Sequence, residues 1–281
     1  MPNKVIITAA LTGSVTPKSL NENIPITPEE IAEDAYRCWK AGAAVVHLHM
    51  RDDNSRGSME TARFKKSVEL LRAHKDCDAV ICCTSSGTYE SISSAARMAH
   101  FKTIPAIEMG SYDVGSFNWG CDALFDNTPK FLVELAECYR QYEVKPEIEI
   151  FDMGMLGNAK HYLKNGVLDA PPYLQFVLGV LGGMEATVEN LLHLVRHLPE
   201  GAIWSAFGIG KDHLPIMFAA LALGANGIRV GLEDNVMYAK GVKASNPMLV
   251  ERAVRVVKEF GKEVATPAEA REILGIKQLA R

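Results

Sequence analysis

The sequence predicts an α/β fold: a single-domain (β/α)8 barrel, or TIM barrel, over residues 1–281, with a C-terminal helical extension. Three observations lead to this prediction. Short apolar runs rich in β-branched residues recur eight times along the chain, and most are followed by an amphipathic segment long enough for a helix. No linker rich in Pro, Gly or Ser divides the chain, and 281 residues lie within the size range of one barrel.

The expected strands are almost continuously apolar, as strands of a parallel sheet covered by helices are. They lie at residues 5–8, 44–49, 79–83, 104–109, 148–151, 176–181, 203–207 and 228–230. The clearest helices follow at 28–40, 60–74, 129–142 and 185–197, and residues 266–281 form the closing helix.

Capping signals set the limits of the first helix. Thr27 is suited to the N-cap, Pro28 to the first helical position and Glu30 to the reciprocal position of a capping box. Gly42 stands where a helix is expected to stop. These signals predict a helix between Thr27 and Gly42.

The alternative fold is a doubly wound open sheet. Its dinucleotide-binding form carries a G-x-G-x-x-G turn after the first strand, and this chain has Thr12-Gly13-Ser14 there. The missing fingerprint favours the closed barrel.

Charge and composition argue against large polyanionic partners. The net charge is −4 and the isoelectric point is about 6.1, without the clustered Lys and Arg that nucleic acids or anionic membranes require. The apolar stretch at residues 5–11 is too short to span a membrane and has no signal-peptide cleavage pattern. We therefore expect a cytoplasmic enzyme that acts on small molecules, and a homo-oligomer, as is common among large α/β enzymes.

The six cysteines form no C-x-x-C pair and predict no disulfide framework. A thiol nucleophile at Cys82 or Cys83 is one interpretation. Small buried side chains on a strand are the favoured one.

In a barrel, chemistry takes place at the C-terminal ends of the strands. The second strand ends in His47-Leu48-His49, and residues at i and i+2 of a strand project from the same face. Both imidazoles can therefore reach one ion, although a pair of core histidines is the alternative. We expect a metal site here.

The last strand supplies the third ligand. Alternation places Arg229, Gly231 and Glu233 on one face, and Asp234 follows where the strand gives way to a loop. A structural ion pair at the strand end is the alternative interpretation. Together, His47, His49 and Glu233 predict a Zn²⁺ site with an open position for a substrate oxygen.

Other strand ends offer groups for a small anionic substrate. The segments 84–87 and 110–113 contain hydroxyls and backbone donors suited to a carboxylate. Glycine turns after the sixth and seventh strands are suited to a phosphorylated cofactor, or are plain tight turns: Gly182, Gly183, Gly208 and Gly210. Glu147 and Glu149 alternate with isoleucines, and Glu149 is a candidate site group inside the barrel.

These residues resemble the β-keto acid cleavage enzymes over nearly the whole chain. The matching segments are Thr8-Ala9-Ala10 with Thr12-Gly13, residues 25–31, His47-x-His49-x-Arg51-Asp52, Gly110-Ser111, Pro146-Glu147-x-Glu149-x-Phe151-Asp152 and residues 230–235. The resemblance implies a zinc barrel that converts a β-keto acid and acetyl-CoA into acetoacetate and a new acyl-CoA.

Carried over by position, the resemblance implies that His47, His49 and Glu233 bind zinc. It implies that Asp234 starts the reaction with Arg229 as its charged partner. The substrate-holding segments contain Thr84, Ser86, Gly87, Ser111 and Asp113.

One segment departs from the family pattern. The member that acts on an amino substrate has a glutamate just after the first Thr-Gly, where this chain has Ser14, Val15 and Thr16. Recognition of a primary amine by that route is therefore not implied. Aromatic residues near Asp113 are an alternative set that could surround a cation: Tyr112, Phe117 and Trp119.

Two other functions remain open from the sequence. One is a zinc aldolase or hydrolase of a small keto acid that needs no CoA. The other is a barrel that binds metal without catalysis. Hydrolytic barrels with His-x-His usually add histidines from later strands, and none ends strands five to eight here.

Overall fold

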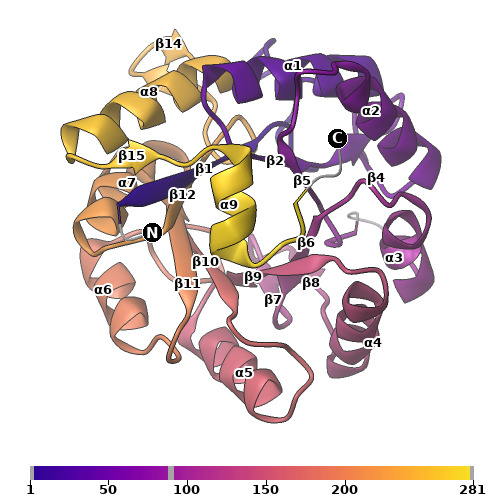
Figure 1. The fold of residues 1–281 in the computed structure, drawn as a ribbon, viewed down its shortest axis with the longest axis vertical. Coiled ribbons are helices and arrows are strands. Elements are labelled where there is room, and N and C mark those ends of the chain that lie inside the picture. Colours follow the sequence, from indigo (N-terminus) through magenta and orange to yellow (C-terminus); the bar gives the residue numbers. More distant parts are fainter. Residues whose placement is uncertain (1–2, 88–91, 279–281) are drawn as a thin grey trace.

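The computed structural model describes residues 3–87 and 92–278. Its described residues form a closed barrel of eight parallel strands surrounded by helices, as the sequence predicted (Figure 1). The spatial order is β12-β11-β10-β9-β6-β5-β2-β1, and β12 pairs with β1 from Ile6 opposite Gly227 to Ala9 opposite Val230. The strands are β1 (Lys4–Ala10), β2 (Val45–Leu48), β5 (Val80–Cys83), β6 (Met109–Asp113), β9 (Lys145–Ile150), β10 (Tyr173–Leu178), β11 (Ile203–Gly208) and β12 (Gly227–Val230).

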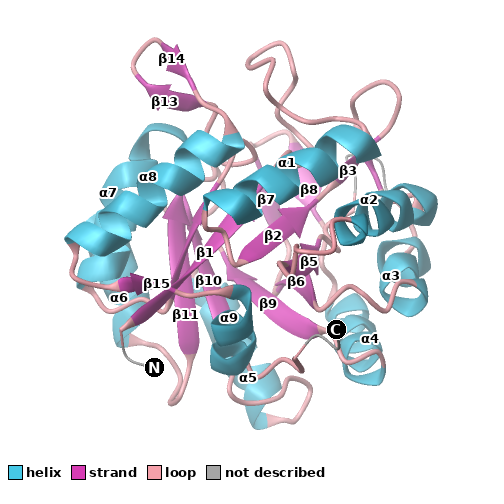
Figure 2. Ribbon diagram, turned by 45° about the horizontal axis from the view of Figure 1, so that its top comes forward, coloured by secondary structure: helices cyan, strands magenta, loops and turns pink. Residues whose placement is uncertain are grey.

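Helices cover the outside of the barrel (Figure 2). The first one is capped as predicted: the Thr27 side chain accepts the Glu30 N–H, the Glu30 side chain accepts the Thr27 N–H, and Gly42 has φ of 116°. The helices are α1 (Pro28–Ala41), α2 (Thr61–Ala73), α3 (Ser94–Thr103), α4 (Pro129–Gln141), α5 (Met153–Lys164), α6 (Val188–Arg196), α7 (His213–Ala222) and α8 (Asn246–Glu259).

Three short hairpins follow the C-terminal ends of barrel strands. They are β3 (Met50–Arg51) with β4 (Gly57–Ser58), β7 (Phe117–Trp119) with β8 (Ala123–Phe125), and β13 (Met237–Ala239) with β14 (Val242–Lys243). A 3-10 turn, η1 (Gly210–Asp212), follows β11. These additions therefore build up the end of the barrel at which catalysis was expected.

The C-terminal extension closes the opposite end. Strand β15 (Glu263–Val264) pairs in parallel with the start of β1, and α9 (Pro267–Leu274) lies across the barrel in Figure 1. Ala270 and Leu274 of α9 pack in one apolar cluster with Ile6 and Val45 from the strands. The predicted closing helix is thus present, but it ends at Leu274 and not at residue 281 as expected.

The fourth expected strand, at 104–109, is wrong in position. Ile104 caps the end of α3, and the Ile107 N–H bonds back to the Ile104 carbonyl in a turn that contains Pro105. Both isoleucines are buried, but in the connection rather than in the sheet. The strand runs instead over Met109–Asp113, and the sixth lies at Tyr173–Leu178 rather than 176–181.

All six cysteines are free thiols, and five of them are buried. Burial raises the pKa of the Cys82 and Cys83 thiols well above the usual value, so neither is an activated nucleophile. Within the described residues, no helix combines the length and apolar character that a membrane span needs.

Candidate functional site

A cavity of about 410 Å³ opens at the C-terminal mouth of the barrel. Its lining comes from the ends of seven barrel strands, from the loop after β1 and from the β7–β8 hairpin. All but the glycine set of the predicted site residues lie in this lining. The mouth is therefore the candidate active site.

The structure brings the three predicted metal ligands together. His47 lies in β2 and His49 directly after it, with their ring centroids 5.2 Å apart. The Oε1 atom of Glu233 is 3.9 Å from Nε2 of His47 and 3.3 Å from Nε2 of His49. One atom from each residue lies within 4.8 Å of the others, and Oε2 of Glu233 is buried without a partner. Two imidazoles and a carboxylate suit a divalent cation with an open coordination position.

Glu233 reaches this position through a turn, not through strand alternation as expected. Strand β12 ends at Val230, and Gly231 has φ of 151°. A Cβ atom on Gly231 would lie 1.8 Å from the Ala10 carbonyl oxygen, so this glycine permits close packing against β1. The N–H groups of Asp234 and Asn235 both donate to the Gly231 carbonyl, which folds the acids back over the barrel mouth.

Arg229 holds the acids of the mouth in one network. Its guanidinium donates to Glu149 at 3.1 Å, to Glu233 at 2.6 Å and to both oxygens of Asp234 at 2.9 Å. Its face lies 4.3 Å from the Phe207 ring centroid. The Arg229 side chain is 2% exposed, so this is a buried cation with three carboxylate partners.

This network gives the acids different pKa values. Burial by itself would raise the pKa of Glu233, but the charges of His49 and Arg229 outweigh it and hold that pKa well below the usual range. Burial raises the pKa of Asp234 to about 6, against the opposing effect of Arg229. Glu233 is thus kept ionised, while the pKa of Asp234 lies closer to neutral pH.

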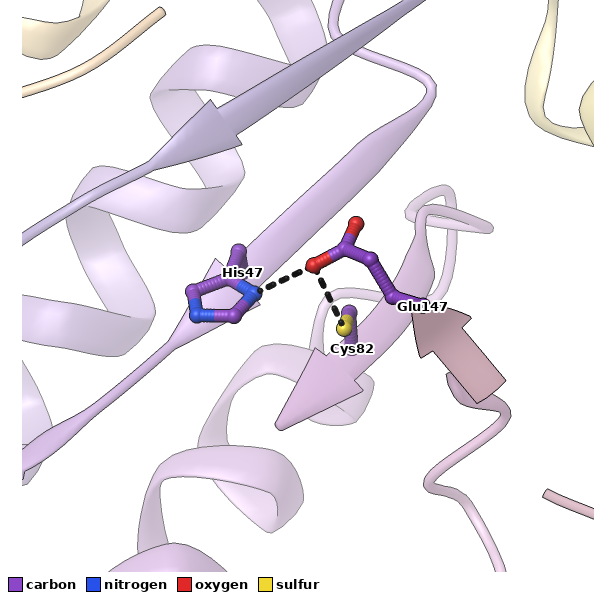
Figure 3. Close-up of side chains that lie close together, drawn as sticks. All are labelled: His47, Cys82 and Glu147. Carbon is purple, nitrogen blue, oxygen red and sulfur yellow. Dashed lines mark hydrogen bonds and ion pairs between the residues drawn. The ribbon is translucent and has the colours of Figure 1, made fainter. Parts of the chain in front are cut away.

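Glu147 is a site residue that the sequence analysis did not assign. Its Oε1 atom lies 3.1 Å from Nδ1 of His47 and 3.6 Å from Sγ of Cys82 (Figure 3). A carboxylate only accepts hydrogen bonds, so Nδ1 of His47 donates to Glu147, and Nε2 is the ring nitrogen that faces Glu233. Alternation along β9 already placed Glu147 on the inner face with Glu149, but its partner was not visible in the sequence.

His47, Cys82 and Glu147 also lie close enough together to hold a metal ion. We favour His47, His49 and Glu233 as the metal ligands. Burial keeps the Cys82 thiol protonated, and neither Cys82 nor Glu147 lines the cavity.

The predicted substrate-holding residues follow β5 and lie in β6, the next two strands after β2 around the barrel. Oγ1 of Thr84 is 2.7 Å from Oγ of Ser86, and the Ser111 hydroxyl accepts the Ser85 N–H at 2.9 Å. Ser111 and Asp113 belong to strand β6 and not to a loop, since the strand runs further than expected. They point inward and line the cavity, as do Thr84, Ser86 and Gly87.

Asp113 and Glu149 are neighbours across the β6–β9 ladder. Burial raises the pKa of Asp113 to about 6 and that of Glu149 well above its usual value, and the charge of Asp113 raises the pKa of Glu149 further. The pair therefore retains a proton near neutral pH. Of the aromatic residues expected near Asp113, Tyr112 is excluded: it is fully buried and its hydroxyl donates to the Leu132 carbonyl.

The glycines expected to bind a phosphorylated cofactor lie beside the cavity and not in its lining: Gly182, Gly183, Gly208 and Gly210. Close packing accounts for two of them. A Cβ atom on Gly182 would lie 1.8 Å from the Asn118 carbonyl oxygen, and one on Gly208 would lie 2.6 Å from the Asp212 carbonyl oxygen.

Arg51 holds the loop after β1, a role that sequence reasoning missed. It is 1% exposed and donates to four backbone carbonyls, at 2.6 to 2.9 Å: Thr12, Gly13, Thr16 and Ser55. Gly13 packs against Glu233, because a Cβ atom there would lie 2.7 Å from Cγ of that residue. Arg51 thus fixes the loop against which a predicted metal ligand packs.

Comparison with known proteins identifies the family of this chain. The family model described as beta-keto acid cleavage enzyme matches residues 4–276. A 3-keto-5-aminohexanoate cleavage enzyme from Fusobacterium nucleatum subsp. nucleatum is 39% identical over 279 residues, which are 99% of this chain and 100% of that protein. A 3-oxoadipate:acetyl-CoA acetyltransferase from Cupriavidus necator is 36% identical, over 99% of this chain and 97% of that protein.

A solved structure supports the fold. The apo structure of ObcA aligns with a TM-score of 0.82 over 90% of this chain and 66% of that chain, at 22% identity. The relatives confirm the prediction of an enzyme of the acyltransferase type. By a family match over nearly its whole length, the chain belongs to the beta-keto acid cleavage enzyme family.

Proposed function

We propose that this enzyme transfers the acyl group of a β-keto acid to CoA, with acetyl-CoA as co-substrate and Zn²⁺ as its metal. Written for R–CO–CH₂–COO⁻, the bond between C2 and C3 breaks and the acetyl group of acetyl-CoA joins C2. The products are acetoacetate and R–CO–CoA. The observation that carries the proposal is the meeting of His47, His49 and Glu233 with the Arg229–Asp234 pair in one cavity.

The donor set at the mouth fits zinc. His47 and His49 offer Nε2 atoms, and Glu233 offers a buried oxygen that has no partner of its own. When bound, Zn²⁺ would supply a Lewis acid for the keto oxygen of the substrate. Glu147 would fix the orientation and the tautomer of His47.

The residues of the chain perform the remaining steps. The hydroxyls of Thr84, Ser86 and Ser111 hold the substrate carboxylate by short hydrogen bonds. Asp234 removes a proton from C2, and the resulting carbanion attacks the thioester of acetyl-CoA. Arg229 holds Asp234 in place and balances its charge. The released CoA thiolate then attacks C3, the C2–C3 bond breaks, and Asp234 returns the proton to C2 of acetoacetate.

The direct test is a screen of β-keto acids with the purified enzyme and acetyl-CoA, with acetoacetate and acyl-CoA detected by mass spectrometry. We expect both products to appear together, and only when acetyl-CoA is present. Turnover without acetyl-CoA would instead identify a zinc aldolase or hydrolase. We further propose that the enzyme is cytoplasmic and that it forms a homo-oligomer. Light scattering measures its mass in solution and so tests the oligomeric state.

Glu147→Gln is expected to weaken zinc binding about 10- to 100-fold, because the charged partner of a metal-binding histidine is replaced by a neutral one. Competition with a chromophoric chelator measures the dissociation constant. Glu137→Gln on the exposed face of α4 is the control and should leave that constant unchanged. Equal zinc affinity in the two variants would remove the role given to Glu147.

Gly13→Ala is expected to weaken zinc binding because the new methyl group meets Glu233, 2.7 Å from Cγ. The matched control is Gly261→Ala, whose φ of 69° resembles the 59° of Gly13 but whose Cβ meets no atom within 4 Å. Both variants should lose about 1–2 kcal/mol of stability from the left-handed backbone. Only Gly13→Ala should also bind zinc more weakly, and a parallel loss in Gly261→Ala would contradict the packing argument.

A further inference from the structure

The cavity has two chemically different halves. Among its described lining residues, the charged or titratable side chains all lie at the base: His47, His49, Asp113, Glu149, Arg229, Glu233 and Asp234. The outer wall is formed by apolar and aromatic side chains of the β7–β8 hairpin and of the ends of β9, β10 and β11. They are Trp119, Ala123, Leu124, Phe125, Phe151, Val177, Val180, Leu181, Phe207 and Ile209, and these residues are called the apolar wall below.

The apolar wall is built and supported from behind. Four rings pack at centroid distances of 4.8 to 6.2 Å, from the hairpin and from the residue after β9: Phe117, Trp119, Phe125 and Phe151. The Gly120 N–H donates to the Leu181 carbonyl, and Gly182 packs against the Asn118 carbonyl. The hairpin and the turn after β10 therefore form one continuous surface.

Part of this wall is left uncovered. Leu124 is 65% exposed and Leu181 is 64% exposed, and these are the two most exposed large apolar side chains of the described residues. Both line the cavity. Exposed apolar residues gathered at a cavity mouth mark a binding surface.

The apolar wall begins at the reacting centre. Phe207 lies against the face of Arg229, whose edge holds Asp234. Exposure increases within the same lining, from the buried Phe207 to the half-buried Ile209 and to Leu181, which is 64% exposed. A group that is attached to the keto carbon and extends along this surface would contact apolar atoms from the base of the cavity to its rim.

We propose that the apolar wall binds the distal chain of the β-keto acid, so that the preferred substrates are 3-oxo acids with an uncharged aliphatic chain. This inference rests on the proposed function and narrows its substrate. The wall carries no charged side chain among the described residues that would pair with a distal ammonium or carboxylate. An ionised distal group would lose hydration there without gaining a partner.

The test compares kcat/KM for 3-oxopentanoate, 3-oxohexanoate, 3-oxoheptanoate and 3-oxoadipate. Each added methylene buried on the wall should raise kcat/KM about fourfold. The 3-oxoadipate value should fall at least about tenfold below that of 3-oxohexanoate. A flat series, or a preference for 3-oxoadipate, would overturn the inference.

Isotope exchange separates this inference from the proposed function. Acetoacetate and labelled acetyl-CoA exchange their acetyl groups in the proposed reaction without any distal chain. Exchange with a flat chain-length series would remove the aliphatic subsite and leave the proposed function intact. No exchange and no turnover of any 3-oxo acid would remove the proposed function itself.

Leu181→Lys tests whether a positive charge on the apolar wall makes the enzyme prefer a substrate with a distal carboxylate. A cation at this exposed position should shift the ratio of kcat/KM for 3-oxoadipate over 3-oxohexanoate upward, at least about tenfold. The control is Val188→Lys on α6, also exposed and outside the cavity lining, which should leave the ratio unchanged. If Leu181→Lys changes only the KM of acetyl-CoA, the wall serves the CoA arm and the inference is wrong. A change of oligomeric state with an unchanged ratio would assign Leu181 to a subunit interface and overturn it as well.

Discussion

His49→Ala is expected to lower kcat/KM about a thousandfold and to strip the enzyme of its metal. Removal of one imidazole leaves His47 and Glu233 as the only ligands of the set. Loss of the Lewis acid withdraws several kcal/mol of transition-state stabilisation, and about 4 kcal/mol corresponds to a factor of a thousand in rate. Metal content by mass spectrometry and kcat/KM for the preferred 3-oxo acid are the two measurements.

His193→Ala is the matched control, because this histidine is exposed on α6 and lies outside the cavity lining. It should keep both the metal and the activity. Adding excess Zn²⁺ should restore part of the activity of His49→Ala if the defect is one of affinity. A His49→Ala enzyme with full metal content and unchanged kcat/KM would refute the assignment of the site.

The fold could be predicted because its signals are local. The capping residues Thr27 and Glu30 and the stop at Gly42 act within one helix, so sequence alone locates that helix to within a residue. The prediction of a strand at 104–109 was wrong because it also relied on local composition alone. Apolar residues in a buried turn resemble those of a strand. Here the Ile107 N–H bonds to the Ile104 carbonyl, and Pro105 cannot donate to a strand ladder.

The clustering of the candidate metal ligands could be predicted in part because the barrel imposes where strand ends meet. His47 and His49 are paired by strand alternation, and the closing pairing of β12 with β1 carries Glu233 to the same mouth. The backbone path of Glu233 could not be predicted. It depends on the contact of Gly231 with the Ala10 carbonyl, which lies more than 200 residues away in the sequence.

The supporting residues were not predictable from the sequence, since their partners come from distant segments. Glu147 contacts His47 across 100 positions, and Arg51 binds carbonyls of a loop 35 to 39 residues before it. The apolar wall combines a hairpin after β6 with turns after β10 and β11. Each segment alone looks like an ordinary loop, and only tertiary packing brings the segments to one cavity.

Arg229→Met is expected to destabilise the protein by about 3–5 kcal/mol, because it leaves buried carboxylates without their cation. Glu149, Glu233 and Asp234 all bind this guanidinium, whose side chain is 2% exposed. Methionine preserves much of the volume next to Phe207, so the loss of charge is the main change. Urea unfolding followed by tryptophan fluorescence measures the effect.

Arg63→Met is the control, since Arg63 pairs with Asp53 and Glu60 at the surface, where those partners are 89% and 65% exposed. Such surface pairs contribute at most about 1 kcal/mol. Both variants remove one arginine charge from the chain. The difference between their losses of unfolding free energy therefore measures the effect of burying the arginine and its partners. Because a bound divalent cation offsets part of the charge of Glu233, chelator-treated Arg229→Met should lose more stability than the zinc-loaded variant. Equal destabilisation of Arg229→Met and Arg63→Met would show that the acids of the mouth do not depend on Arg229 for their charge balance.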